Sequence, residues 1–297
     1  MRNPKCSFWI PPAPFTRFEI TILLFFFLNP FSFQCNKFAL GESTGKAYII
    51  MKSIKILVLF LALNLINNCK NAPNKGEPTS SIITFKEDAT PFTAPQKELI
   101  HEVVLESEKE IRNLLPTLPD SISVSLEIVD WDLDVVGGVT GRTETNSPPV
   151  VLIQISEKFP GGVTKATQMA LKHTLFHEFH HLSRGWAIQD NVYGPGISIA
   201  SINEGLAVVF SEEYTGESME ADTPPEATIA EQWVEEIRAL PINANYQHWM
   251  FQHPDGRLAV GYRTGNYLIR KAMAKSGKDV LELSELTPDE IYQLAGY

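Results

Sequence analysis

The chain has 297 residues, of which 44% are hydrophobic and 20% are charged, a composition typical of a globular protein with one large core or two small ones. The first 68 residues contain seven Lys/Arg and two Asp/Glu, which leaves 18 basic and 33 acidic residues, a net charge of −15, in the remainder. So acidic a domain lacks the Lys/Arg clusters that phosphate backbones require, and we therefore expect no nucleic-acid partner.

Residues 51–69, MKSIKILVLFLALNLINNC, have the layout of a secretory signal: a short basic start, an apolar stretch and then Cys69. The ending LINNC resembles a bacterial lipobox, whose cysteine becomes the lipidated first residue, although Asn67 and Asn68 depart from the small residues preferred there. We therefore expect residues 51–68 to be a signal peptide and Cys69 to carry a lipid anchor, with a plain cleaved signal as the alternative. The expected product is an exported, membrane-anchored lipoprotein of the bacterial cell envelope.

Upstream, residues 20–35 are apolar but are interrupted by Asn29 and Pro30, so they are too short to span a bilayer comfortably. We expect Met51 to be the true start and residues 1–50 to be a non-native upstream extension. Residues 69–81, rich in Pro, Asn, Gly and Ser, predict a tether, and residues 82–297 a folded domain.

The cysteines of the chain all lie at or before this tether, as Cys6, Cys35 and Cys69. The folded domain therefore has neither a disulfide nor a thiolate ligand, although export would permit disulfides. A metal site in this domain must use His, Asp and Glu.

Hydrophobic periodicity predicts a small sheet followed by helices. The first expected element is an amphipathic helix over residues 93–115; the expected strands cover residues 121–130 and 150–156, with a Gly- and Thr-rich edge strand and turn at residues 135–149. A long helix follows, with Thr164 as its N-cap and Gly185 as its end. Further helices are expected over residues 197–214, 227–239 and 262–275. The predicted fold class is α+β, with a small mixed sheet packed on the long helix and a mainly helical C-terminal part.

The long helix divides into an apolar and a polar side. At about 100° per residue, an apolar stripe forms from Leu171, Leu175, Phe179 and Leu182. The opposite side collects His173, His177, His180, His181 and Arg184. A solvated polar face without metal is the simplest interpretation of these histidines.

A sharper interpretation comes from His177-Glu178-Phe179-His180-His181, which fits the HExxH pattern. Its i, i+4 spacing places two imidazoles one helical turn apart, where both can bind one zinc ion. Glu178, beside the first ligand, can then reach a water molecule on the metal as a general base. His173 and His180 are expected to support the site or lie at the surface.

A catalytic zinc site usually has three protein ligands and one open position. The metzincin pattern requires a Gly and a third His after the motif, where this chain has Arg184 and Ala187, and peptide deformylases need a cysteine ligand. Gluzincins use a Glu from a second helix, and SINEGLAVVFSEEY supplies Glu204, 23 residues after His181. The alternative for Glu204 is a salt bridge, for example to Arg184; Glu212 and Glu213 look like the exposed end of the same helix.

Three stretches, TLFHEFHHLSR, INEGLAVVF and GYRTGNYLIRKAM, together resemble a bacterial family of predicted zinc-dependent proteases related to gluzincins. The resemblance runs from about residue 82 to the C-terminus. It implies a zincin-like fold, Zn²⁺ as the cofactor, His177, His181 and Glu204 as its ligands, and Glu178 as the catalytic carboxylate.

The expected reaction is hydrolysis of a peptide bond in a peptide or protein substrate, with Glu178 as the base and Tyr262 as the donor to the developing oxyanion. Tyr267 and His248 are second candidates for that donor, and Tyr262 is otherwise a packing residue at a helix start. Residues 137–142, GGVTGR, either offer edge-strand backbone groups to an extended peptide or form only a turn-rich strand. The alternative function is a zinc-binding, non-proteolytic lipoprotein that acts as a scaffold or partner-binding module.

Overall fold

The computed structural model describes residues 81–297. The predicted extension, signal peptide and Cys69, and all of the predicted tether but its last residue, lie outside the described residues. Within residues 81–297, no helix is both long and apolar enough to cross a membrane.

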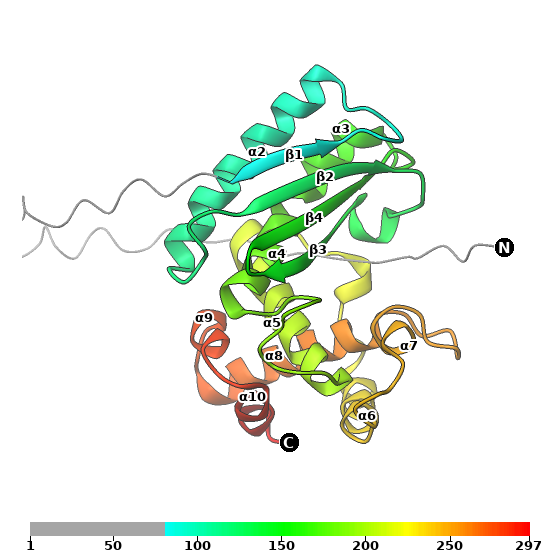
Figure 1. Ribbon diagram of the computed structural model, residues 1–297. Coiled ribbons are helices and arrows are strands. Elements are labelled where there is room, and N and C mark those ends of the chain that lie inside the picture. The colour runs from blue at the N-terminus through cyan, green and yellow to red at the C-terminus, as the bar shows by residue number, and fades with distance from the viewer. Residues whose placement is uncertain (1–80) are drawn as a thin grey trace, which may run out of the picture. The chain divides into compact units, whose positions relative to one another are not determined.

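The described chain is an α+β fold with a small mixed sheet, as predicted (Figure 1). Its strands are β1 (Ile82–Lys86), β2 (Ser123–Val129), β3 (Val139–Asn146) and β4 (Pro149–Ser156). They lie in the order β1-β2-β4-β3; β1, β2 and β4 are parallel, and β3 runs antiparallel to β4 at one edge. The predicted edge strand is therefore confirmed. The strand β1 was not predicted, because its sequence IITFK has only five residues and does not alternate strictly between apolar and polar residues.

The helix α2 (Ala94–Leu114) lies in the chain between β1 and β2. The helices after the last strand are α3 (Gly162–Ala166), α4 (Lys172–Arg184), α5 (Ile197–Thr215), α6 (Ala227–Arg238), α7 (Tyr246–Met250), α8 (Val260–Ser276), α9 (Val280–Ser284) and α10 (Pro288–Ala295). Short helical turns add η2 (Asp134–Val136), η3 (Thr167–Leu171) and η4 (Glu220–Asp222). The helices α2, α5, α6 and α8 confirm the predicted helices to within two residues at each end. The short α7, α9 and α10 were not predicted, since five to eight residues hold too few turns to establish a helical period.

The predicted long helix is formed by three consecutive segments, α3, η3 and α4, of which η3 is a π-helical turn. Thr164 as N-cap is wrong, because the helix already begins at Gly162 and Thr164 lies within its first turn. The predicted end is correct: Gly185 has φ +75° and terminates α4.

The main core lies where α2 and α4 pack against the sheet. The predicted apolar stripe of α4 is fully inside it, with the side chains of Leu171, Leu175, Phe179 and Leu182 at most 5% exposed. In Figure 1 the C-terminal helices lie below the sheet, with α5 and α8 central among them. The polar side of α4 faces these helices rather than water, and this decides the chemistry of its histidines.

Candidate metal centre

The helix α4 is buried on both of its sides. The side chains of His177, Glu178 and His181 are 0%, 1% and 4% exposed. The two imidazoles, one turn apart, stand edge to face with their ring centroids 4.1 Å apart. The solvated polar face that the sequence left open as an alternative is therefore wrong, because α5 and the loop after α4 cover this side.

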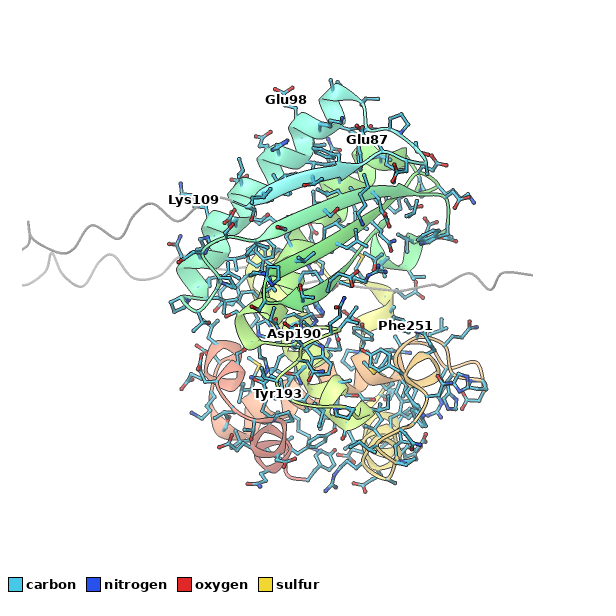
Figure 2. All side chains as sticks on the ribbon, in the orientation of Figure 1. Glu87, Glu98, Lys109, Asp190, Tyr193 and Phe251 are labelled. Atoms are coloured by element: carbon cyan, nitrogen blue, oxygen red, sulfur yellow. The ribbon has the colours of Figure 1, made fainter. Side chains whose placement is uncertain are left out.

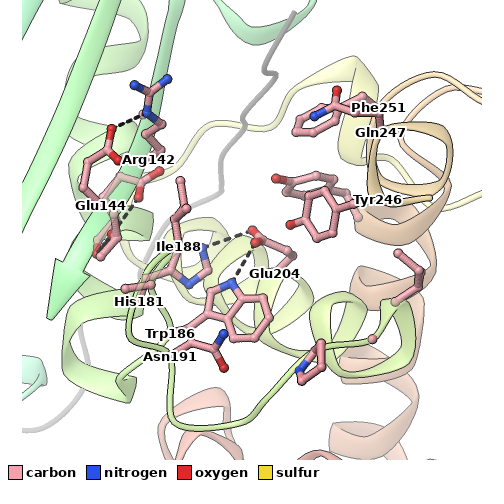
Figure 3. Close-up of a pocket in the computed structure, with 18 of the residues that line it drawn as sticks. Arg142, Glu144, His181, Trp186, Ile188, Asn191, Glu204, Tyr246, Gln247 and Phe251 are labelled. Carbon is pink, nitrogen blue, oxygen red and sulfur yellow. Dashed lines mark hydrogen bonds and ion pairs between the residues drawn. The ribbon is translucent and has the colours of Figure 1, made fainter. Parts of the chain in front are cut away.

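Glu204 extends from α5 toward both histidines. Its Oε2 lies 3.0 Å from Nε2 of His177 and 3.1 Å from Nε2 of His181, so that one oxygen and two nitrogens converge. Figure 3 shows the contact between Glu204 and His181. Within the described chain, this is the group of His, Cys, Asp and Glu side chains whose ligand atoms all lie within 4.8 Å of one another. The structure thus brings together the three residues that the sequence suggested as ligands.

The spacing and chemistry of these atoms suit zinc. Ligand atoms at the usual 2.0 to 2.1 Å from a tetrahedral zinc ion lie about 3.3 Å from one another, close to the separations here. Burial and the neighbouring histidines His181, His173 and His180 hold the pKa of His177 well below its ordinary value. A neutral imidazole is the form that binds a metal, so the residues present fit a two-histidine, one-carboxylate zinc site.

Trp186, just after α4, supports Glu204 from the other side. Its Nε1 donates a hydrogen bond of 2.9 Å to Oε1 of Glu204, which leaves Oε2 directed at the histidines (Figure 3). The sequence did not suggest this role, because an isolated Trp after a helix has no pattern that points to it. The proposed salt bridge from Arg184 to Glu204 is absent from the described chain: Arg184 instead donates to Oδ1 of Asn203 and to the main-chain oxygens of Ser284 and Leu286.

Glu178 is held by the edge strand β3. The hydroxyl of Thr143 lies 2.8 Å from Oε2 of Glu178 and 3.0 Å from its main-chain oxygen. Directly beside it, Gly141 leaves the space that the carboxylate occupies, since a Cβ on Gly141 would lie 2.7 Å from Cγ of Glu178 and 2.8 Å from Oε1. Burial raises the pKa of Glu178 to about 7, while His181 and the Thr143 hydrogen bond oppose that shift. A carboxylate with a pKa near neutrality is suited to accept and return a proton.

These groups adjoin a cavity of about 800 Å³. The walls come from β3, the loop after α4, the start of α5 and the α6–α8 region, and its lining includes Gly141, Thr143, Glu178, His181, Trp186, Glu204, Tyr246 and Tyr262. His177 is fully buried and is not among the residues that line the cavity. The cavity therefore gives a ligand access to Glu178, His181 and Glu204 together.

Two tyrosines face the carboxylates across this cavity. Tyr262, the third residue of α8, is 6% exposed; Tyr246 is 40% exposed, but its ring points into the cavity toward Glu204 (Figure 3). Desolvation of the hydroxyl groups in the cavity, together with the charges of Glu204 and Glu178, raises the pKa of both phenols well above the ordinary value, so both stay protonated and can donate. Tyr246 was missed by the sequence analysis because it lies in the unpredicted α7.

The second candidates for the oxyanion donor are not among the residues that line the cavity. Tyr267 places its hydroxyl 3.1 Å from Oε1 of Glu231 at the surface, and His248 is exposed on α7. Glu212, expected at an exposed helix end, is instead buried and paired with Arg270. The sequence of α5 alone does not predict this burial, because the paired residue Arg270 lies on α8.

The remaining histidines of α4 are buried rather than at the surface. His180 places Nε2 2.8 Å from the hydroxyl of Ser284 and packs its ring against Phe210 in a tilted arrangement, and Nδ1 of His173 lies 3.4 Å from the hydroxyl of Thr215. Both link α4 to the helices beneath it and neither joins the ligand group.

The glycines of two sequence landmarks let α5 and α8 touch at the backbone. A Cβ on Gly205 would lie 2.3 Å from the carbonyl carbon of Gly265, and a Cβ on Gly265 would lie 2.0 Å from the main-chain oxygen of Ser201. This close crossing holds Glu204 of α5 and Tyr262 of α8 against the same cavity. It explains physically why glycine follows Glu204 and recurs three residues after Tyr262.

A family model described as "Predicted Zn-dependent protease (DUF2268)" matches residues 162–293. The matched segment begins at α3 and ends in α10, so it includes the histidine helix, Glu204 and Tyr262 but not the sheet. The match supports a zinc-dependent protease, and hence a hydrolase. No curated protein and no solved structure matches the chain.

Proposed function

We propose that this protein is a gluzincin-like metallopeptidase that hydrolyses peptide bonds with one bound zinc ion. The observation that carries the proposal is the convergence of His177, His181 and Glu204, all buried, beside a cavity that Glu178 also lines. A purely structural zinc site gains nothing from a second, non-ligating carboxylate that lines a cavity. The position of Glu204 on a second helix supports the gluzincin-like class.

In this proposal His177, His181 and Glu204 hold the metal, and Trp186 orients Glu204 through Oε1. When bound, zinc supplies the Lewis acidity that activates water and polarises a carbonyl group. Glu178 accepts the proton of the attacking water on its carboxylate and delivers it to the leaving amine. Thr143 fixes the carboxylate for both transfers through its hydrogen bond to Oε2.

The negative charge that develops on the carbonyl oxygen needs a hydrogen-bond donor. Tyr262 is the first candidate and Tyr246 the second, because both phenols keep their protons beside the same cavity. Donors of this kind contribute about 3 to 4 kcal/mol to lowering the barrier in other hydrolases.

The proposal is tested on residues 70–297, purified without chelators. We expect about one zinc per chain, cleavage of members of a peptide library, and loss of activity by roughly 10² to 10⁴ in Glu178→Gln with zinc retained. His177→Ala and Glu204→Gln should lose the metal as well. Zinc binding without any cleavage by the unaltered protein would favour the scaffold alternative, and no zinc would refute both.

We further propose that the domain is exported and attached to a membrane through a lipid on Cys69. The support is the order of basic, apolar and cysteine residues over residues 51–69. Labelling of cells with a radioactive fatty acid should mark the full-length protein and not its Cys69→Ser variant. An equal label on the variant would refute lipidation at this residue.

A further inference from the structure

The outer edge of β3 borders the cavity and is already partly occupied. Ile188 and Gln189, in the loop after α4, donate their main-chain N–H groups to the main-chain oxygens of Thr143 (3.0 Å) and Glu144 (3.2 Å). This segment is a turn rather than a strand, and its N–H groups occupy main-chain oxygens of β3 that an added peptide strand would otherwise use.

Asp190 fastens the same segment at the end of β3. Its Oδ1 accepts the main-chain N–H of Asn146 at 2.7 Å and its Oδ2 that of Ser147 at 3.0 Å. Its main-chain oxygen also accepts from Nδ2 of Asn146 at 3.1 Å. Figure 2 shows Asp190 where the sheet meets the C-terminal helices, and Tyr193 further along the same loop. From Thr143 to Ser147 the edge is thus closed by the protein's own chain.

The next position back along this edge is open. In an antiparallel ladder, alternate residues turn both main-chain groups to the same side. The main-chain oxygen of Gly138 accepts from Ser156 of β4, whereas that of Thr143 points outward to Ile188, so Gly141 faces outward with Thr143. No other element of the described chain forms a main-chain hydrogen bond with Gly141.

Gly141 is also the residue of β3 that lies against Glu178. A substrate chain that pairs with the outward main-chain groups of Gly141 therefore lies beside the residue of β3 that contacts Glu178. On the Thr143 side of Gly141, the strand edge is already bonded to the Ile188–Asp190 segment. Toward that side there is no room on the strand edge for further substrate residues. The edge of β3 is thus open at Gly141 and occupied on the Thr143 side, which limits the length of peptide that the site accepts on that side.

We propose that the Ile188–Asp190 segment closes one end of the substrate groove, so that the enzyme trims peptides within a few residues of one chain end. Asp190 is the residue that determines this specificity, by holding the segment on β3. The proposal rests on the peptidase function proposed above and names its substrate class: peptides with a short segment on the Thr143 side.

The test uses quenched peptides that share one cleavable core. One peptide is short, and others are extended by about ten residues at the N-terminus, the C-terminus or both, far longer than the open edge of β3. For the unaltered enzyme we expect extension at one end to lower kcat/KM about tenfold or more, and extension at the other end to have little effect. In Asp190→Ala, the same extension should lower kcat/KM by only about threefold or less.

Two further variants separate release of the loop from general damage. Ile188→Pro removes the N–H that pairs with Thr143 and should relieve the penalty in the same way. Asp279→Ala is the matched control: Asp279 is also exposed and also accepts a main-chain N–H, that of Glu282 at 2.8 Å, but at the start of α9. Hydrogen exchange at residues 188 and 189 should speed up in Asp190→Ala and not in Asp279→Ala.

Each outcome decides the proposal. Equal cleavage of the short and doubly extended peptides by the unaltered enzyme would overturn it while leaving the peptidase function intact. A penalty that persists in Asp190→Ala after hydrogen exchange has shown the loop to be released would also overturn it. If the zinc-bound protein cleaves none of the peptides, the proposed peptidase function itself is refuted.

Discussion

Gly141→Ala tests the contact between β3 and Glu178 directly. The added Cβ would lie 2.7 Å from Cγ of Glu178, 2.8 Å from Oε1 and 2.8 Å from Cγ2 of Thr174. Since carbon atoms pack comfortably at about 3.5 to 4.0 Å, the carboxylate must move by about 1 Å. A displacement of that size can lower the rate about 10²-fold, and the overpacking should lower the free energy of unfolding by roughly 1 to 3 kcal/mol.

The assay measures kcat/KM on a quenched peptide together with zinc content and urea unfolding. Zinc content should remain unchanged, because no ligand side chain is among the atoms nearest to the added Cβ. Glu178→Asp removes one methylene and makes room for the added Cβ. Gly141→Ala should therefore lower kcat/KM much less in the Glu178→Asp variant than in the unaltered enzyme. Full activity in Gly141→Ala would refute the close contact between Gly141 of β3 and the Glu178 side chain. Strictly additive effects of the two substitutions on kcat/KM in the double variant would refute it as well.

Further predictions concern the groups around the same cavity. Trp186→Phe removes the hydrogen bond to Oε1 of Glu204 and should weaken zinc binding by about 10- to 100-fold in a chelator competition. Tyr246→Phe and Tyr262→Phe should each retain zinc, and the one that removes the oxyanion donor should lower kcat by about 10²-fold or more with little change in KM. Burial raises the pKa of Glu178 to about 7 from 4.5, so folded metal-free protein keeps a proton there that the unfolded chain releases, and stability falls as pH rises through this window. Metal-free Glu178→Gln should therefore be more stable than the unaltered protein by up to about 3 kcal/mol near pH 8, with the difference gone near pH 4.5 in urea unfolding.

The controls for these predictions are also in the chain. Tyr267→Phe removes a surface phenol that bonds Glu231 and should leave kcat unchanged. If neither cavity tyrosine affects kcat, the oxyanion donor is another group. A metal-free Glu178→Gln protein that is no more stable near pH 8 would mean that this carboxylate is not held in a desolvated state.

Local patterns accounted for much of the fold. The helices α2, α5, α6 and α8 and the strands β2 and β4 each contain enough residues for their hydrophobic period to show. The predicted start at Thr164 was wrong because α3 begins two residues earlier, after Gly161, without the side-chain cap hydrogen bond that a threonine N-cap would supply. The short helices α7, α9 and α10 were not predicted, because they contain too few residues to show a helical period.

By itself, the sequence determined the α+β class, the apolar stripe of α4 and the placement of two histidines one turn apart, because periodicity along a helix is a local property of the chain. Only the tertiary structure decided that the polar side of α4 is buried, that Glu204 meets both histidines, and that Trp186 and Tyr246 join the cavity. It also decided that Asp190 closes the edge of β3, 44 residues from Asn146 in the chain. The physical reason is that contacts between distant segments depend on how whole elements pack, such as the Gly205–Gly265 crossing, and no local pattern encodes them.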